Sequence, residues 1–210
     1  MMRKNNLFSL LLLLAMFTAT GISCKKNNGP RIVEGKVQNS TTSEGIAGAT
    51  VYLMQRNPDC FSCQGTKIAN TTADSEGNFH FEFTPEEGFR YSIGAEASKY
   101  FNNYYKGGES FDHYEKESLM TVGLDPEAWL KIHIKNTQPV DGTDHIGINL
   151  FLGGGVGYYG THVDTFLIQK VYGSRSITVP WFVTKNNVTN NYSSQVYSSQ
   201  FDTTLYTITY

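Results

Sequence analysis

Thr72-Ala73-Asp74-Ser75-Glu76-Gly77-Asn78-Phe79-His80-Phe81 carries two structural signals in ten residues. Its first half has the composition of a tight hairpin turn, in which Gly77 supplies the positive φ that such turns require. In its second half every other residue is a phenylalanine, and this alternation continues to Phe83. A period of two is typical of a half-buried β-strand. The stretch therefore predicts a turn followed by a strand.

The same alternation occurs on both sides of this stretch. Apolar and polar residues alternate in Arg31–Val37, Ala49–Met54 and Tyr91–Ala95, each of which is long enough to form a strand. The composition agrees, because aromatic residues make up 13% of the chain, charged residues only 17%, and threonine (21) outnumbers alanine (9). β-Branched and aromatic residues favour strands over helices. We therefore predict an all-β protein.

Three blocks follow one another along this part of the chain: Gly35-Lys36-Val37, Ile46–Leu53 and Thr72–Phe81. Together they resemble the carboxypeptidase regulatory-like domain family, over about residues 31–100. The resemblance implies a seven-stranded, transthyretin-like β-sandwich, which we expect to occupy residues 31–124 with Glu117–Leu124 as its closing strand. It also implies an accessory or scaffolding role and no active site, so no functional residue follows from it.

A second run of alternating residues begins after Pro126. It contains five candidate strands: Leu130–Ile134, Ile146–Leu152, Phe166–Val171, Ile177–Val183 and Tyr206–Tyr210. They predict a second, smaller β-sandwich-like domain at residues 125–210, near the lower size limit for an independent core. A single β architecture merged with the first sandwich is the alternative. The glycine-rich segment Gly153–Gly160 is expected to be a flexible or bulged connection.

The first 23 residues have the organisation of a secretory signal peptide. Arg3 and Lys4 give a positive start, and the apolar run Leu7–Phe17 is too short to span a bilayer. The run is followed by Gly21-Ile22-Ser23-Cys24, which resembles the lipobox of bacterial lipoproteins. This resemblance implies that residues 1–23 are removed and that the thiol of Cys24 is diacylated. Two acyl chains give stable membrane anchoring where one does not.

Residues 24–30 are polar, and we expect them to form a tether between the lipid and the first sandwich. Lys25 follows the lipidated cysteine, whereas an aspartate at this position resembles the inner-membrane retention signal of such lipoproteins. We therefore expect the protein to be anchored in the outer membrane and to face the periplasm, with membrane lipid as its partner through Cys24.

Cys60 and Cys63 form a pair once Cys24 is assigned to the lipid. Their spacing allows a disulfide that closes a loop, a redox motif or half of a zinc site. A redox motif needs a helix N-terminus, and a zinc site needs two further ligands. We favour the disulfide, because an oxidising compartment supports it.

The aromatic segment Tyr100–Tyr114 is our candidate for ligand binding, because it is rich in aromatic, amide and glycine residues and has no strand period. Aromatic rings stack on the apolar faces of sugars, and the same residues suit a protein interface. Packing over the edge of the sandwich explains them equally well. The six candidate residues are Tyr100, Phe101, Tyr104, Tyr105, Phe111 and Tyr114.

Motifs for catalysis are missing from the sequence. Gly155–Gly160 fits a dinucleotide-binding pattern, but no helix is predicted after it to receive a phosphate. Asp141–Asp144 and the His162/Asp164 pair lack the further ligands of a metal site, and turn chemistry explains the former. The formal net charge of −2 argues against a nucleic-acid partner. We therefore expect no cofactor and no bound metal.

These observations predict a non-catalytic lipoprotein of the cell envelope that acts as a binding or scaffold module. Its partner would be a glycan, bound through the aromatic segment, or an envelope protein. A structural partner of an outer-membrane transporter or adhesin assembly is the first alternative. A metal-dependent hydrolase is the second, and it is the less favoured one.

Overall fold

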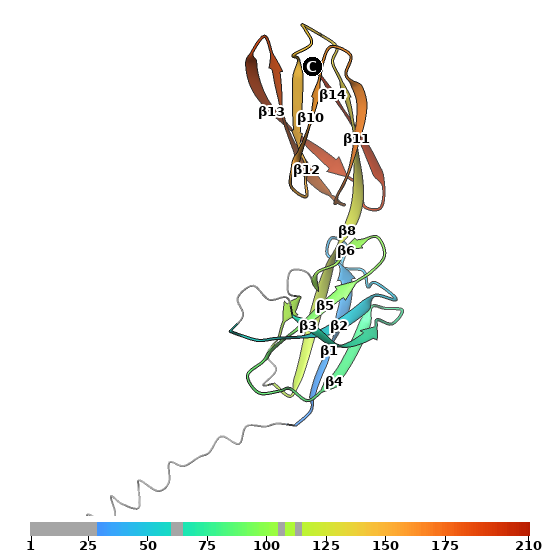
Figure 1. Cartoon of the computed structure of the whole chain (residues 1–210). Helices are drawn as coiled ribbons and strands as arrows, with labels where there is room; N and C mark the ends of the chain where they lie inside the picture. Colours follow the sequence, from blue (N-terminus) through green and yellow to red (C-terminus); the bar gives the residue numbers. More distant parts are fainter. Residues whose placement is uncertain (1–28, 60–64, 105–107, 112–114) are drawn as a thin grey trace, which may run out of the picture.

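The computed structural model describes residues 29–59, 65–104, 108–111 and 115–210. Within them the chain forms 14 β-strands, arranged as two β-sandwiches that stand end to end (Figure 1). The all-β prediction is confirmed. The described residues include no helix that is long and apolar enough to cross a membrane.

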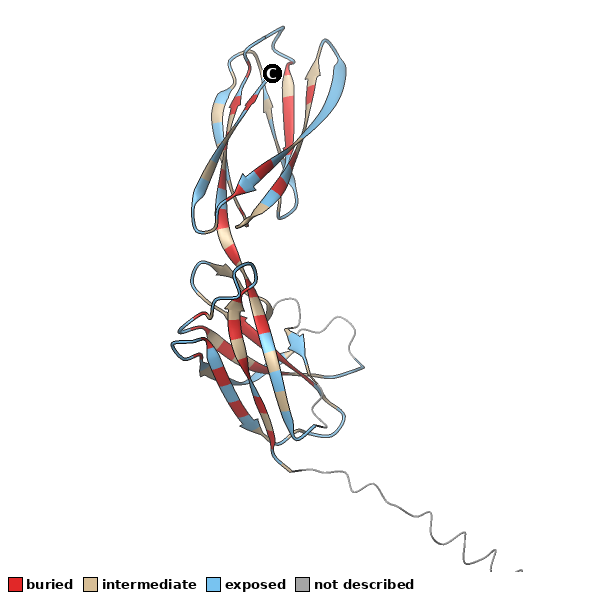
Figure 2. Ribbon diagram, turned by 180° about the vertical axis from the view of Figure 1, so that it is seen from behind, coloured by how far each residue is buried: buried red, intermediate tan, exposed pale blue. Residues whose placement is uncertain are grey.

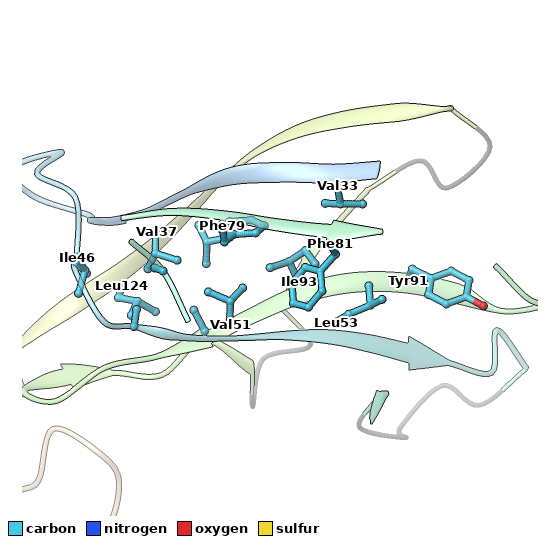
Figure 3. Packing of buried hydrophobic residues seen from close by; sticks show 14 residues of the cluster. Val33, Val37, Ile46, Val51, Leu53, Phe79, Phe81, Tyr91, Ile93 and Leu124 are labelled. Carbon is cyan, nitrogen blue, oxygen red and sulfur yellow. The ribbon is translucent and has the colours of Figure 1, made fainter. Parts of the chain in front are cut away.

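The N-terminal sandwich is built from two sheets. One contains β1 (Arg31–Asn39), β4 (Asn78–Phe83) and the first half of β8 (Glu117–Lys135); the other contains β2 (Thr50–Arg56), β3 (Thr66–Thr72), β5 (Arg90–Glu96) and β7 (Glu109–Ser110). Alternate residues of both sheets point between them, as Figure 3 shows for Val33, Val51 and Ile93. Phe79 and Phe81 of the predicted strand lie in this core, and both are almost fully buried.

The C-terminal sandwich has a core of aliphatic side chains. In one sheet β11 (Asp164–Tyr172) and β14 (Thr203–Thr209) flank the second half of β8. The other sheet has the order β10 (Gly155–Tyr159), β9 (His145–Asn149), β12 (Arg175–Lys185) and β13 (Val188–Ser198). The predicted strand residues Leu130, Ile132, Ile148 and Val179 are all buried between these two sheets.

A single strand, β8, belongs to both sandwiches. Every even-numbered residue from Val122 to Ile134 is buried, so one period of two runs across the expected domain boundary at 124/125 without interruption (Figure 2). We expected two separate strands here, one on each side of the boundary, and that expectation was wrong. At about 3.3 Å per residue the 19-residue strand extends over roughly 60 Å.

Two further expectations need correction, and two longer strands were not predicted. The turn at Asp74–Asn78 forms, with Gly77 at a φ of 86°, but β3 and β4 on either side of it lie in different sheets, so it is not a hairpin turn. Part of Gly153–Gly160 forms β10, because it pairs with β9, and is not merely a connection. The strands β3 and β13 were not predicted because both are largely exposed and their apolar residues do not recur at every second position.

Candidate functional site: the junction between the sandwiches

The two sandwiches meet at a cleft, which we call the junction cleft. It has a volume of about 470 Å³. Its lining comes from both sandwiches: Tyr100, Phe101, Asn102, Asn103, Gly123, Asp125, Glu127, Leu152, Lys170 and Tyr172. β6 (Tyr100–Phe101) supplies the first of these residues, and it pairs with β8 at Asp125 and Pro126. Part of the predicted aromatic segment therefore lies where the sandwiches join.

Backbone hydrogen bonds hold β8 to both sandwiches at this point. The amide of Glu127 donates to the carbonyl of Lys99 in the N-terminal sandwich at 2.9 Å, and its carbonyl accepts from Phe201 in the C-terminal sandwich at 2.7 Å. The amide of Gly173 donates to the carbonyl of Pro126 at 2.8 Å. Lys99 and Phe201 both have positive φ angles, which most residues adopt only at a cost. These three hydrogen bonds hold Pro126 and Glu127, in the middle of β8, to the N-terminal sandwich through Lys99 and to the C-terminal sandwich through Gly173 and Phe201.

Charged side chains at the junction are paired. A guanidinium nitrogen of Arg175 lies 2.7 Å from a carboxylate oxygen of Asp125, and the hydroxyl of Ser40 donates to the same oxygen at 2.7 Å. Lys170 Nζ lies 2.7 Å from a carboxylate oxygen of Glu127. The Asp125 contacts thus connect a loop of the N-terminal sandwich with β12 of the C-terminal sandwich.

Aromatic rings cross the same boundary. Phe101 contacts Tyr172 edge to face, with ring centroids 4.6 Å apart, and Tyr100 contacts Phe201 at 5.2 Å. Burial raises the pKa of the Tyr100 hydroxyl above its usual value. Such perpendicular pairs stabilise an interface beyond the area they bury. At least two of the six predicted aromatic residues therefore pack between the sandwiches.

The other predicted aromatic residues lie elsewhere. Tyr104 packs on the outer face of the sheet that contains β2 and β3. Its ring centroid lies 5.7 Å from that of Tyr52, and Lys67 Nζ lies 3.8 Å from its ring centre. Phe111 contacts Phe83 at the rim of the N-terminal core, at 6.1 Å. The four described members thus point to three different places and do not form one platform. Tyr105 and Tyr114 lie outside the described residues.

One polar group in the junction cleft is unusual. The side-chain oxygen of Asn103 accepts a hydrogen bond from the amide of Ala95 at 2.7 Å, whereas its buried Nδ2 has no partner within the part of the chain that the structure describes. Buried amide groups are nearly always hydrogen-bonded. The Nδ2 itself is buried, and the cleft surface combines an aromatic wall with the charged side chains of Asp125, Glu127 and Lys170, which is chemistry that suits a polar ligand with hydroxyl groups.

Asp125, Glu127, Lys170 and Arg175 were not among the predicted site residues. A signal was present in the sequence: Asp125 and Glu127 interrupt an otherwise apolar and neutral run just where the two predicted domains meet. Carboxylates at this position need cationic partners, but sequence spacing could not show that they come from residues 43 to 50 positions away. These long-range pairs depend on the tertiary fold.

The predicted lipid and cysteine positions, Cys24, Cys60 and Cys63, lie outside the described residues. The described residues contain no group of three or more His, Cys, Asp or Glu side chains that could hold a metal ion. In the segment Asp141–Asp144 the carboxylate of Asp144 is fully buried and accepts hydrogen bonds from the amide of Val140 and from Asn136. These hydrogen bonds lower the pKa of Asp144, and they agree with the turn interpretation.

No family model matches this chain, and no curated protein matches it. The likeness of residues 31–100 to the carboxypeptidase regulatory-like family therefore stays a prediction.

The chain matches several solved structures at low sequence identity. The chain resembles the Bacillus anthracis TIE protein (12% identity, TM-score 0.37), with 86% of this chain and 34% of that one covered. The match to a streptococcal ancillary pilin (10% identity, TM-score 0.39) covers 87% of this chain and 62% of that one. The match to GBS52, the minor pilin of Streptococcus agalactiae (10% identity, TM-score 0.38), covers 85% of this chain and 94% of that one. The chain thus spans about a third of the first and less than two thirds of the second, and TM-scores this low carry no argument about function.

Proposed function

We propose that this protein is a non-catalytic, lipid-anchored spacer of the cell envelope, in which two β-sandwiches form one stiff unit. The observation that carries the proposal is the continuity of β8 through both sandwiches. A flexible linker would permit independent movement of two domains, whereas a strand that is hydrogen-bonded on both sides resists bending.

The position of the chain ends supports the same role. β1 begins at the end of the N-terminal sandwich that faces away from the junction, and the C-terminus lies at the opposite end of the molecule (Figure 1). A tether of seven residues, 24–30, spans at most about 25 Å. If Cys24 carries lipid, the N-terminal sandwich stands next to the membrane and the C-terminal sandwich is held away from it.

Stiffness can be measured directly by electron-spin distance measurements. Keto-containing amino acids at Glu82 in β4 and Thr207 in β14, both exposed, would carry spin labels without involving the native cysteines. We expect one narrow distance distribution for the full chain. A matched pair with Asp125→Ala and Glu127→Ala added should give a broader one, because both junction ion pairs are lost. A broad distribution in the original chain would refute the spacer, whereas a variant that stays narrow would assign the stiffness to the backbone of β8.

The lipid anchor needs its own test. Cys24→Ser should abolish incorporation of labelled palmitate and move the protein out of the outer-membrane fraction. Cys60→Ser and Cys63→Ser are matched controls and should leave both unchanged. Unaltered fractionation of Cys24→Ser would contradict lipid anchoring but would leave the stiffness of the two sandwiches untouched.

Glycan binding is a second candidate function, favoured by the aromatic and polar side chains that line the junction cleft. Asn102 lines the cleft and is partly exposed, so Asn102→Ala removes an amide that a ligand can reach. Screening the full chain against oligosaccharides should reveal binding that Asn102→Ala weakens about tenfold, the value of one lost hydrogen bond to a ligand. Binding that Asn102→Ala leaves unchanged would place the ligand elsewhere, and a complete lack of binding would remove this candidate.

A further inference from the structure

We propose that the outer edge of β13 forms an antiparallel β-ladder with β13 of a second copy of this chain. We call residues 188–196 the β13 edge. β13 is the last strand of its sheet, and β12 is the only strand that pairs with it among the residues described. Near its end the carbonyl of Tyr197 accepts a hydrogen bond from the Thr204 hydroxyl at 3.4 Å, so the free part ends before that residue.

The β13 edge lacks the usual protection of an edge strand. Proteins guard such edges with charged residues, proline, bulges or short length. The edges β3, β4 and β11 carry charged residues, β7 has two residues, and β10 has five. β13 has 11 residues without charge or proline, and the whole stretch from Asn186 to Phe201 is uncharged. β14 is also uncharged, but it has only seven residues.

The hairpin that leads into β13 shows which backbone groups face outward. Asn186 and Asn187 form a two-residue turn in which both φ angles are positive, 51° and 60°. In such a turn the closing pair, Lys185 and Val188, is hydrogen-bonded. Hydrogen-bonded pairs then alternate along the ladder. The amides and carbonyls of Thr189, Asn191, Ser193 and Gln195 therefore point away from β12, and the outward carbonyl of Tyr197 agrees with this phase.

A second copy fits this edge for two reasons. A two-fold axis places the residue on the axis next to its own counterpart and its neighbours close to theirs, so a charged residue near the axis would repel its copy; the β13 edge has none. With the axis at Tyr192, Asn191 faces Ser193 of the other copy and Thr189 faces its Gln195. Tyr192 (47% exposed) then meets the other Tyr192, and Val188 (58% exposed) lies opposite Val196, whose own side chain is buried in the core. This register covers both exposed apolar residues of the edge.

Photocrosslinking on the full chain in its own membrane tests the contact. Benzoylphenylalanine in place of Tyr192 should give a dimer that contains both epitope tags when two tagged copies are co-expressed. The matched control is benzoylphenylalanine in place of Tyr159, another exposed tyrosine, which lies on the β10 edge at the other side of the sheet. We expect no dimer from that position.

Charge substitutions test the register. Asn191→Lys with Ser193→Lys places like charges opposite each other twice and should lower the crosslink yield about tenfold. Asn191→Lys with Ser193→Glu uses the same positions but pairs opposite charges, and the yield should return to within about threefold of the original. Thr207→Lys with Thr209→Lys adds the same charge on β14 and should have no effect. Unchanged melting temperatures would show that the variants fold.

Three outcomes would overturn the proposal: a Tyr192 crosslink to a different protein only, no crosslink at all, or equal yields from the Lys/Lys and Lys/Glu variants. Loss of the dimer in the β14 variant would also overturn it, because it would assign the contact to β14. The test is independent of the spacer proposal. If the protein proves monomeric, the distance between the two sandwiches is still the one that the spacer proposal predicts. If the junction proves flexible, β13 can still pair with a second copy.

Discussion

The N-terminal sandwich has three aromatic rings, Phe79, Phe81 and Tyr91, buried in an otherwise aliphatic core, whereas the buried core residues of the C-terminal sandwich are all aliphatic. Their surfaces differ more. The long edges of the N-terminal sandwich carry charged residues, while β13 and β14 of the C-terminal sandwich carry none. Both halves thus form a β-sandwich with a buried core, but only the C-terminal sandwich has long edge strands without charged residues.

This difference indicates a division of roles. Core composition is free to vary as long as volume and pattern are kept. Edge protection, in contrast, decides whether a sandwich stays alone or pairs with another chain. The guarded N-terminal sandwich has the properties of a support, and the unguarded C-terminal sandwich has those of the part that makes contact.

The largest effects should come from truncating one core at a time. Leu53 and Leu130 are both fully buried, one in each core, and Leu→Ala at such sites costs about 2–5 kcal/mol. Because β8 contributes to both cores, we expect a single unfolding transition in calorimetry, which either substitution moves to lower temperature. Two transitions, of which each variant moves only one, would show that the sandwiches unfold separately and that β8 does not couple them.

A smaller, pH-dependent effect should distinguish two turn carboxylates. Asp74 in the N-terminal sandwich is exposed and accepts from the amide of Asn78, whereas Asp144 in the C-terminal sandwich is buried. Hydrogen bonds lower the pKa of both. A lowered folded-state pKa adds stability above the usual value of 3.8, and this stability is lost as the pH falls through the folded-state pKa.

Melting temperatures between pH 7 and pH 2 would measure this effect. Asp144→Asn should lower the melting temperature by several degrees at pH 7, and the gap to the original protein should close in acid. Asp74→Asn should show the same trend with a smaller gap, because its carboxylate is solvated. A gap for Asp144→Asn that does not change with pH would mean that shape, and not charge, matters at this turn.

Most of the fold could be predicted from alternation alone, and the reason is visible in β8. Its buried residues recur every second position, so both of its halves were recognised as strands. Their continuity was missed because Pro126 and the flanking carboxylates look like a break in the sequence. β13 was missed for a different reason. Most of its side chains are polar and exposed, so apolar residues do not alternate along it.

The candidate site was predicted less well. The aromatic segment did point to Tyr100 and Phe101, but composition could not show that their rings meet Phe201 and Tyr172, more than 70 residues away. Asp125 and Arg175 are 50 residues apart, and only the arrangement of the two sandwiches brings them together. Residues at an inter-domain junction are recruited from distant strands, and their pairing leaves no local pattern.

The smallest expected effect compares the ion pair at the junction with a histidine–glutamate hydrogen bond on an open sheet face. The Arg175–Asp125 pair is partly buried and shares its oxygen with Ser40, whereas the His80–Glu34 pair on the N-terminal sandwich is more than half exposed on both sides. Asp125→Asn should therefore cost about 1 kcal/mol in urea unfolding, and Glu34→Gln less than about 0.5 kcal/mol. Because salt screens partly buried pairs less than exposed ones, 1 M salt should leave part of the Asp125 effect. Equal losses for the two variants would mean that the junction pair is no more than a surface pair, and the stiffness of the molecule would then depend on the backbone of β8 alone.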